Sequence, residues 1–159
     1  MKGVFQMTEG KIETIWQVHS IKMVKTEMET PQITIRTPDD CAKFLYNEIG
    51  DLDRENFCVM TLNTKNQITS FHIAHIGSLN ASIVNPREVF KVAILQSANS
   101  IIVAHNHPSG NPTPSSEDID VTKRLQHAGE IVGIPVLDHL IIGDNHFISL
   151  NEKGFMLQR

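Results

Sequence analysis

Two histidines, His105 and His107, stand two positions apart at the end of a short apolar run, Ile101 to Ala104. The run has the length and the β-branched content of a buried strand, and residues i and i+2 of an extended chain point to the same face. Asp118 follows after a loop. Two imidazoles and one carboxylate, with a fourth position left open, form the ligand set of a catalytic zinc site. The spacing therefore predicts a metal site made by His105, His107 and Asp118.

The segment between the histidines and Asp118 has to leave the strand and start a helix. Proline or glycine occupies positions 108, 110, 112 and 114, so the backbone turns there and cannot be helical. Ser115, with an acid three positions later, is typical of a helix N-cap, and the first helical turn favours the negative charge of Asp118. A single histidine at a strand end is usually structural, but a pair followed by a loop, a cap and an acid favours a metal site.

The same residues resemble a known motif. His105-x-His107, seven residues, Ser115, two residues and Asp118 match the JAMM motif of the JAB/MPN+ metalloproteases at every defined position. The flanking sequence resembles the RadC-like branch of that family in Asn85-Pro86-Arg87-Glu88, in His-Asn-His-Pro-Ser-Gly, and in Leu-Asp-His-Leu-Ile-Ile-Gly over residues 137–143. The resemblance extends from about Ile33 to the C-terminus. It implies a JAB/MPN fold, similar to that of the cytidine-deaminase-like zinc enzymes, a Zn²⁺ cofactor, and hydrolysis of peptide or isopeptide bonds by a metal-activated water.

A zinc hydrolase also needs a base that takes the proton of the water and a donor for the oxyanion. The glutamates considered as the base are Glu48, Glu55, Glu88 and Glu117. Glu88 and Glu117 lie on predicted helices, where a solvent-facing charge is the simpler interpretation. Glu55 precedes a predicted strand; the residues alone make it an ordinary strand-edge acid, and the resemblance implies that it is the catalytic base. For Ser115, the residues predict a helix cap, and the resemblance adds a role in holding the oxyanion.

The remaining polar residues near the motif are predicted to be structural, except for Asp138 and His139, whose role stays open. Asn106 lies between the two ligands and points to the opposite face of the strand. Asp138 and His139 belong to the family-like run, and two interpretations stay open for them: orientation of a metal ligand, or a buried strand residue with a local hydrogen bond. The other histidines lack a partner at ligand spacing; they are His19, His72, His75, His127 and His146.

Helices alternate with paired strands along the chain, which predicts an α/β (α+β) domain with a central mixed sheet flanked by helices. We expect helices over residues 37–50, 85–95 and 116–128, the last closed by Gly129, and strands over 57–62, 68–76, 101–104, 136–142 and 146–150. Residues 33–159 are predicted to form the JAB/MPN domain. Residues 1–32 are predicted to be an N-terminal extension, with partial alternation over 12–24 that is compatible with a strand.

The composition is that of an ordinary globular protein, with 40% hydrophobic and 20% charged residues in a chain of 159. The net charge is −4 and no basic block occurs, which argues against an electrostatic nucleic-acid surface. No apolar run is long enough for a bilayer and no secretory leader is evident, so we expect a cytoplasmic location. Cys41 and Cys58 are isolated, and we expect free thiols.

Several functional hypotheses follow. The leading one is a zinc metallopeptidase acting on a peptide or protein substrate, and a homo-oligomer is left open. The alternative is a RadC-like zinc-binding protein of DNA repair or DNA metabolism without peptidase activity. A catalytically silent scaffold is disfavoured because the motif residues are intact. A zinc deaminase is disfavoured because the Pro-Cys-x-x-Cys ligand pair is missing.

Overall fold

The central element is a five-stranded mixed sheet with the strand order β2-β1-β3-β4-β5. The structure is a computed structural model, and it describes residues 32–78 and 84–157. The strands are β1 (Asn56–Leu62), β2 (Ile68–Ile76), β3 (Ser100–Asn106), β4 (Val136–Ile142) and β5 (Phe147–Ser149). β3 and β4 run parallel, and the other neighbours are antiparallel. The predicted α/β class with a mixed sheet is therefore confirmed.

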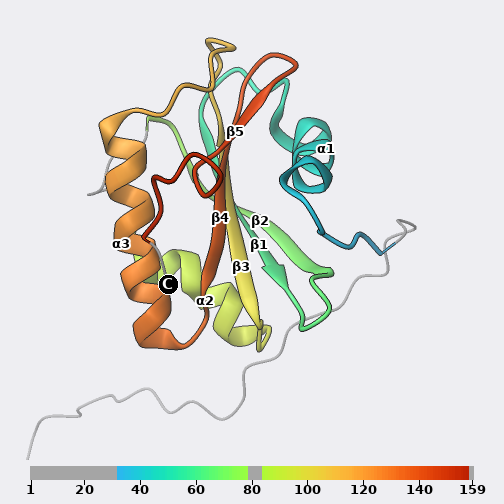
Figure 1. Ribbon diagram of the computed structural model, residues 1–159, viewed down its shortest axis with the longest axis vertical. Coiled ribbons are helices and arrows are strands. Elements are labelled where there is room, and N and C mark those ends of the chain that lie inside the picture. The colour runs from blue at the N-terminus through green and yellow to red at the C-terminus, as the bar shows by residue number, and fades with distance from the viewer. Residues whose placement is uncertain (1–31, 79–83, 158–159) are drawn as a thin grey trace, which may run out of the picture.

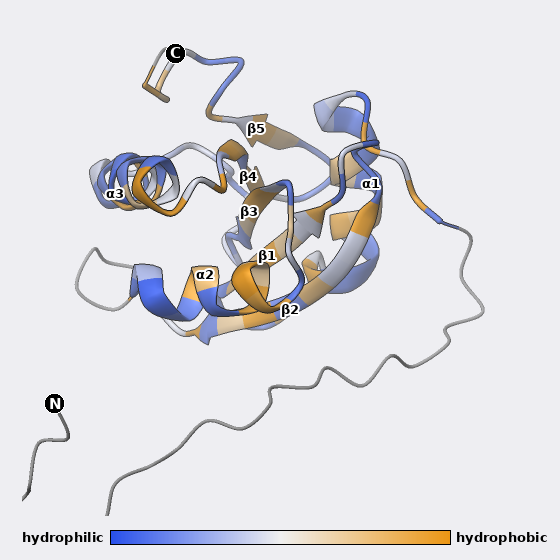
Figure 2. Cartoon of the chain, turned by 90° about the horizontal axis from the view of Figure 1, so that it is seen from below, coloured by the Kyte–Doolittle hydropathy of each residue, from blue (hydrophilic) through white to orange (hydrophobic). Residues whose placement is uncertain are grey.

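Helices cover both faces of the sheet (Figure 1). They are α1 (Pro38–Ile49), α2 (Pro86–Leu95) and α3 (Ser116–Val132). Figure 2 shows the apolar strands enclosed between α1 on one side and α2 and α3 on the other. The strands β1 and β3 are buried along their whole length. Because successive side chains of a strand point to opposite faces, their residues contribute alternately to two apolar clusters, one on each face of the sheet.

Each helix begins directly after a polar residue that caps it. The side chains of Thr37, Asn85 and Ser115 each accept a hydrogen bond from a backbone N–H of the first turn. Thr37 and Ser115 form full capping boxes with the acid three positions later. The cap at Ser115 fixes where α3 starts and therefore also fixes the position of Asp118.

The predicted end of the third helix is wrong. α3 does not stop at Gly129 but continues to Val132 and is capped by Gly133, whose φ of 77° lies in the left-handed region. Gly129 is needed inside the helix for another reason. A Cβ at that position would lie 2.6 Å from the carbonyl oxygen of Ile134 and 3.2 Å from the Phe90 ring. The glycine therefore permits close packing and is not a helix stop.

Two further predictions concern a strand near the N-terminus and the lack of a membrane-spanning segment. The strand predicted over residues 12–24 lies outside the described residues. Among the described residues, no helix is both long and apolar enough to cross a membrane.

Candidate metal centre

The two histidines and the aspartate of the predicted metal site come together at one end of the sheet. His105 Nε2 lies 3.0 Å from His107 Nε2 and 3.2 Å from Asp118 Oδ1, and His107 Nε2 lies 3.7 Å from Asp118 Oδ2. Around a tetrahedral zinc ion with bonds of about 2.0–2.1 Å, neighbouring ligand atoms are about 3.3 Å apart. The observed separations lie on both sides of that value. The three side chains could hold a metal ion.

Strand alternation and the helix cap explain this convergence. His105 is the last but one residue of β3 and lies fully buried on the α3 face, and His107 follows as the chain leaves the sheet. Asp118 lies in the first turn of α3, where its carboxylate accepts hydrogen bonds from the N–H and the hydroxyl of Ser115, at 2.8 and 2.7 Å. The Ser115 hydroxyl in turn accepts from the Asp118 N–H at 3.1 Å. Ser115 therefore fixes Asp118, and its predicted role as the cap is confirmed.

The second ring nitrogen of each histidine is also engaged. His107 Nδ1 lies 2.7 Å from the carbonyl oxygen of Asn111. Because a carbonyl can only accept, Nδ1 carries the proton, and Nε2 of the neutral His107 presents a lone pair to the cluster. His105 Nδ1 lies 2.8 Å from Nε2 of His139, a buried residue of β4. Both histidines thus turn Nε2 toward Asp118.

The charge state of the cluster follows from burial and pairing. Burial lowers the pKa of His105 below its ordinary value and lowers the pKa of His139 much further. The hydrogen bond with Asp118 raises the pKa of His107. For Asp118, burial opposes ionisation, but its contacts with the two imidazole rings, together with the hydrogen bond from the Ser115 backbone, outweigh it and hold the pKa of the carboxyl well below its usual range. The cluster is therefore an anionic carboxylate beside two imidazoles, a combination that attracts a cation.

Glu55, the predicted base, lies within electrostatic reach of this cluster. Its charge acts on His105 and His107 and favours the protonated form of each, after the larger effects of burial and of Asp118. Glu55 is half-buried and directly precedes β1. Its carbonyl oxygen accepts from the N–H of Gly77 at 2.8 Å, so the segment is tied to the end of β2.

Asn106 holds the backbone on both sides of Glu55. Its Oδ1 accepts from the Asn56 N–H at 2.8 Å, and its Nδ2 donates to the carbonyls of Arg54 and Leu52 at 3.0 and 3.2 Å. Asn106 is buried on the face of β3 opposite to His105. The strand that presents the histidines therefore also positions the segment of Glu55.

The loop between β3 and α3 is fastened to the turn between β4 and β5. The N–H of His107 donates to the Ile142 carbonyl at 2.8 Å, and the N–H of Asp144 donates to the Gly110 carbonyl at 2.9 Å. Gly110 has a φ of 80°, in the left-handed region that favours glycine. At Gly143, a Cβ would lie only 2.3 Å from the Gly110 oxygen. Close backbone contact thus holds the loop that carries His107.

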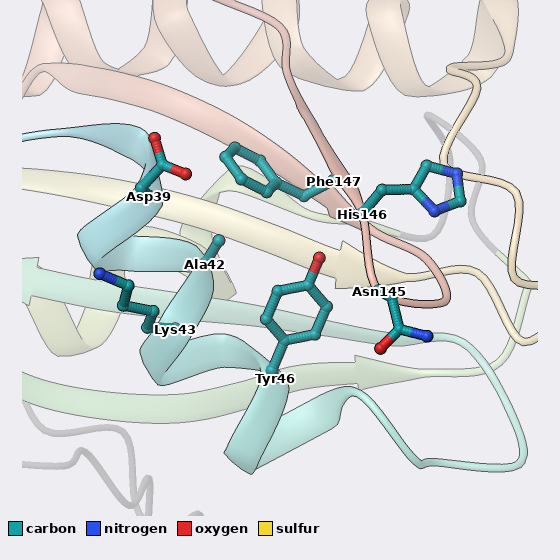
Figure 3. Close-up of a pocket in the computed structure, with 7 residues that line it drawn as sticks. All are labelled: Asp39, Ala42, Lys43, Tyr46, Asn145, His146 and Phe147. Atoms are coloured by element: carbon teal, nitrogen blue, oxygen red, sulfur yellow. The ribbon is translucent and has the colours of Figure 1, made fainter.

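A hollow of about 390 Å³ on the other side of the sheet has no part in this cluster (Figure 3). It lies between α1 and the turn before β5, and it contains none of the predicted site residues. The residues that line it are Asp39, Ala42, Lys43, Tyr46, Asn145, His146 and Phe147.

The glutamates not chosen as the base have ordinary surroundings. Glu88 is exposed and forms an ion pair of 2.8 Å with Lys91 on the same helix. Glu117 is exposed as well.

Both cysteines, Cys41 and Cys58, are buried free thiols whose pKa is raised by burial.

One residue of the site was not found from the sequence. Thr122 lies one helical turn after Asp118, and its hydroxyl contacts both the Asp118 carbonyl and His139 Nδ1, each at 2.6 Å. His139 is a buried strand residue with a hydrogen bond to His105, an arrangement that both interpretations of the sequence allow, so an orienting role stays a prediction. A threonine at position i+4 from a candidate ligand was the only sequence signal for Thr122.

Comparison with known proteins assigns the chain to a family. Residues 35–155 match the RadC-like JAB domain family, to which the chain belongs. Among its relatives are UPF0758 proteins from bacteria. One from Bacillus cereus (strain G9842) is 56% identical over 168 aligned positions, covering 96% of this chain and 74% of the relative.

Two other relatives show the same pattern. A UPF0758 protein of Halalkalibacterium halodurans is 46% identical over 169 aligned positions, covering 97% of this chain and 73% of the relative. A UPF0758 protein of Geobacillus sp. (strain WCH70) is 61% identical over 122 positions, covering 77% of this chain and 54% of the relative. The predicted RadC-like resemblance is therefore confirmed.

Proposed function

We propose that this protein is a zinc-dependent hydrolase of peptide or isopeptide bonds, with His105, His107 and Asp118 as the metal ligands. The proposal is carried by the convergence of two Nε2 atoms and a carboxylate at 3.0–3.7 Å from one another, close to the separation of about 3.3 Å between ligands around tetrahedral zinc. Three protein ligands leave a fourth position for water, as in catalytic zinc sites. Bound zinc would act as a Lewis acid and lower the pKa of that water to about 7.

In this proposal Glu55 is the general base. Its carboxylate takes a proton from the attacking water and later delivers it to the leaving amine. The electrostatic effect of Glu55 on both histidines supports this role, because the base must lie beside the metal without occupying a ligand position. A peptide or protein is the proposed substrate.

Ser115 would contribute to the oxyanion site. In the structure its hydroxyl donates to Asp118 Oδ2, so it must turn away from that oxygen to reach the substrate. The Ser115 N–H donates to the same oxygen at 2.8 Å. Asp118 therefore keeps one hydrogen bond from Ser115 when the hydroxyl turns, and the ligand stays oriented.

The test is a pair of matched substitutions, Glu55→Gln and Glu88→Gln. Glu55→Gln removes the base but no ligand, so we expect full zinc content and turnover of an isopeptide or peptide library lowered by about 10²–10⁴-fold. Glu88→Gln removes only an exposed helix-face charge, and turnover should stay within a few-fold. Elemental analysis and a hydrolysis assay, performed side by side, check both. Full activity of Glu55→Gln would refute the role of Glu55.

Substitution of the ligands tests the metal separately from the reaction. His105→Ala and His107→Ala should each lose most of the zinc; retention of one zinc per chain by both would refute the assignment. A function in DNA metabolism without peptidase activity predicts salt-dependent DNA binding instead. The net charge of −4 gives that alternative no support.

A further inference from the structure

A chain of hydrogen bonds lies behind the cluster of His105, His107 and Asp118. It joins β3 to α3, which carry the proposed ligands His105 and Asp118. It runs from the backbone carbonyl of Asp118 to the Thr122 hydroxyl (2.6 Å), from that hydroxyl to His139 Nδ1 (2.6 Å), and from His139 Nε2 to His105 Nδ1 (2.8 Å). Thr122, His139 and His105 are each fully buried. The chain therefore begins at one proposed ligand and ends at another without reaching solvent.

The protons in this chain have a direction. A carbonyl oxygen can only accept, so the short contact between Asp118 and Thr122 requires the single proton of the Thr122 hydroxyl. Thr122 Oγ1 must then accept from His139 Nδ1–H. The fully buried His139 ring lies between a hydroxyl and an imidazole, and with its one proton on Nδ1 its Nε2 accepts from His105 Nδ1–H. The Nε2 atom of His105, which faces Asp118 and His107, is thereby left with a lone pair.

We propose that Thr122 and His139 are positioning residues that set the tautomer of His105 and keep its Nε2 free to bind the metal. The inference rests on the metal site of the proposed function but not on the hydrolytic reaction. The choice of tautomer matters because the Asp118 carboxylate, 3.2 Å from His105 Nε2, attracts the imidazole proton to the wrong nitrogen. The hydrogen-bond chain from Thr122 opposes that attraction.

The ring of Phe57 holds the two imidazoles in this arrangement. Its centroid lies 6.3 Å from that of His105, with the rings nearly parallel, and 5.6 Å from that of His139, edge to face. Phe57 is fully buried and has no hydrogen-bonding group of its own. It limits how the rings can turn but does not influence which nitrogen is protonated, so that selection is assigned to Thr122.

The experiment compares Thr122→Val, which lacks the hydroxyl, with Thr122→Ser, which keeps it. Without Oγ1, His139 loses the acceptor for Nδ1–H, carries its proton on Nε2 instead, and donates to His105 Nδ1. We expect zinc affinity, measured by competition with a chromophoric chelator, to fall by about 10–100-fold in Thr122→Val. In Thr122→Ser it should stay within a few-fold of the unsubstituted protein.

A second readout separates this role from a purely structural one. Long-range ¹H–¹⁵N correlation spectra of the metal-free protein at pH 8 report which ring nitrogen is protonated. The share of His105 protonated on Nδ1 should fall in Thr122→Val, whereas His107, held by the Asn111 carbonyl, should keep its tautomer. A general loosening of the site would change both histidines, and that result would contradict the proposal.

The outcomes also separate this inference from the proposed function. Equal zinc affinity and equal His105 tautomer shares in Thr122→Val and the unsubstituted protein would overturn the inference, whatever the hydrolytic activity. A tightly metal-binding protein with no hydrolytic activity would refute the proposed function and leave the inference testable. Should Thr122→Val fail to fold, Thr122→Ala removes the same hydroxyl without adding a methyl group, and the same comparison decides.

Discussion

The contact between Asn106 and the segment of Glu55 makes the sharpest quantitative prediction. Asn106→Ala removes three hydrogen bonds, to the N–H of Asn56 and to the carbonyls of Arg54 and Leu52. It leaves both proposed histidine ligands in place, because Asn106 projects from the opposite face of β3. The substitution therefore tests whether the position of Glu55 can be disturbed without loss of the metal.

The cost in stability follows from what each lost bond leaves behind. Asn56 is 4% exposed, so its N–H would lose its partner in a buried position, which costs about 1–3 kcal/mol. Arg54 is exposed and Leu52 half-buried, so water can replace the bonds to their carbonyls at little cost. Adding a small cavity term, we expect the free energy of unfolding to fall by about 2–4 kcal/mol. A typical domain has about 5–15 kcal/mol, so the variant should stay folded.

The effect on activity should be larger than the effect on metal binding. With its backbone anchors removed, Glu55 moves relative to the metal, and a displacement of about 1 Å can cost about 10²-fold in rate. We expect urea unfolding to show the stability loss, elemental analysis to show unchanged zinc, and the hydrolysis assay to show the drop in turnover.

The matched control is Asn63→Ala in the turn between β1 and β2. The Asn63 side chain also makes three hydrogen bonds, to the backbone N–H groups of Lys65 and Gln67 and to the Gln67 side chain. That turn is accessible to water, so we expect a loss of about 1 kcal/mol or less and unchanged turnover. If Asn106→Ala reduces turnover no more than Asn63→Ala does, Asn106 does not position the proposed base.

Three further predictions concern the metal and its loop. Gly143→Ala should lower the free energy of unfolding and weaken metal binding, because the new Cβ would displace Gly110. As a control, the Cβ in Gly133→Ala would meet no atom within 4 Å, so only backbone strain should lower the free energy of unfolding, by about 1–2 kcal/mol in thermal unfolding. Asp118 raises the pKa of His107 above 6.5, and a proton on His107 competes with the metal for Nε2. Below that pKa, zinc affinity should therefore fall by about tenfold per pH unit, which zinc titrations at several pH values check. Chelation should leave the far-ultraviolet circular dichroism spectrum unchanged, because apolar clusters on both sides of the sheet stabilise the fold without the metal, and complete loss of the helical signal would instead mean that the metal is structural.

The order of the elements could be predicted from the sequence because each has a local signal. Thr37, Asn85 and Ser115 are polar caps directly before apolar periodicity, and they cap the helices in the structure. The end of α3 could not be found in this way. Gly129 looks like a stop when only local conformation is considered, but it is required by the backbone of Ile134, which packs against it after the chain has turned back.

In the candidate site, too, some residues could be predicted from local sequence and others could not. The spacing of His105, His107 and Asp118 is local and could be interpreted from strand and helix geometry. The contacts of Thr122 and His139 depend on the pairing of β3 with β4, in which Val103 lies opposite His139, and on the packing of α3 against that face. No short-range pattern encodes this arrangement, so the sequence analysis could only leave the role of His139 open.

The end of β3 carries more of the site than its two histidines. Because successive residues of a strand point to opposite faces, His105 reaches Asp118 and His139 on the α3 side, while Asn106 reaches the segment of Glu55 on the α1 side. A shift of β3 by one residue against its neighbours would exchange these faces and place the Asn106 amide beside Asp118. The antiparallel pairing of Phe57 with His105 and the parallel pairing of His105 with Ile141 both oppose such a shift. The position of the proposed base and the protonation of the proposed ligand therefore depend on the same strand register.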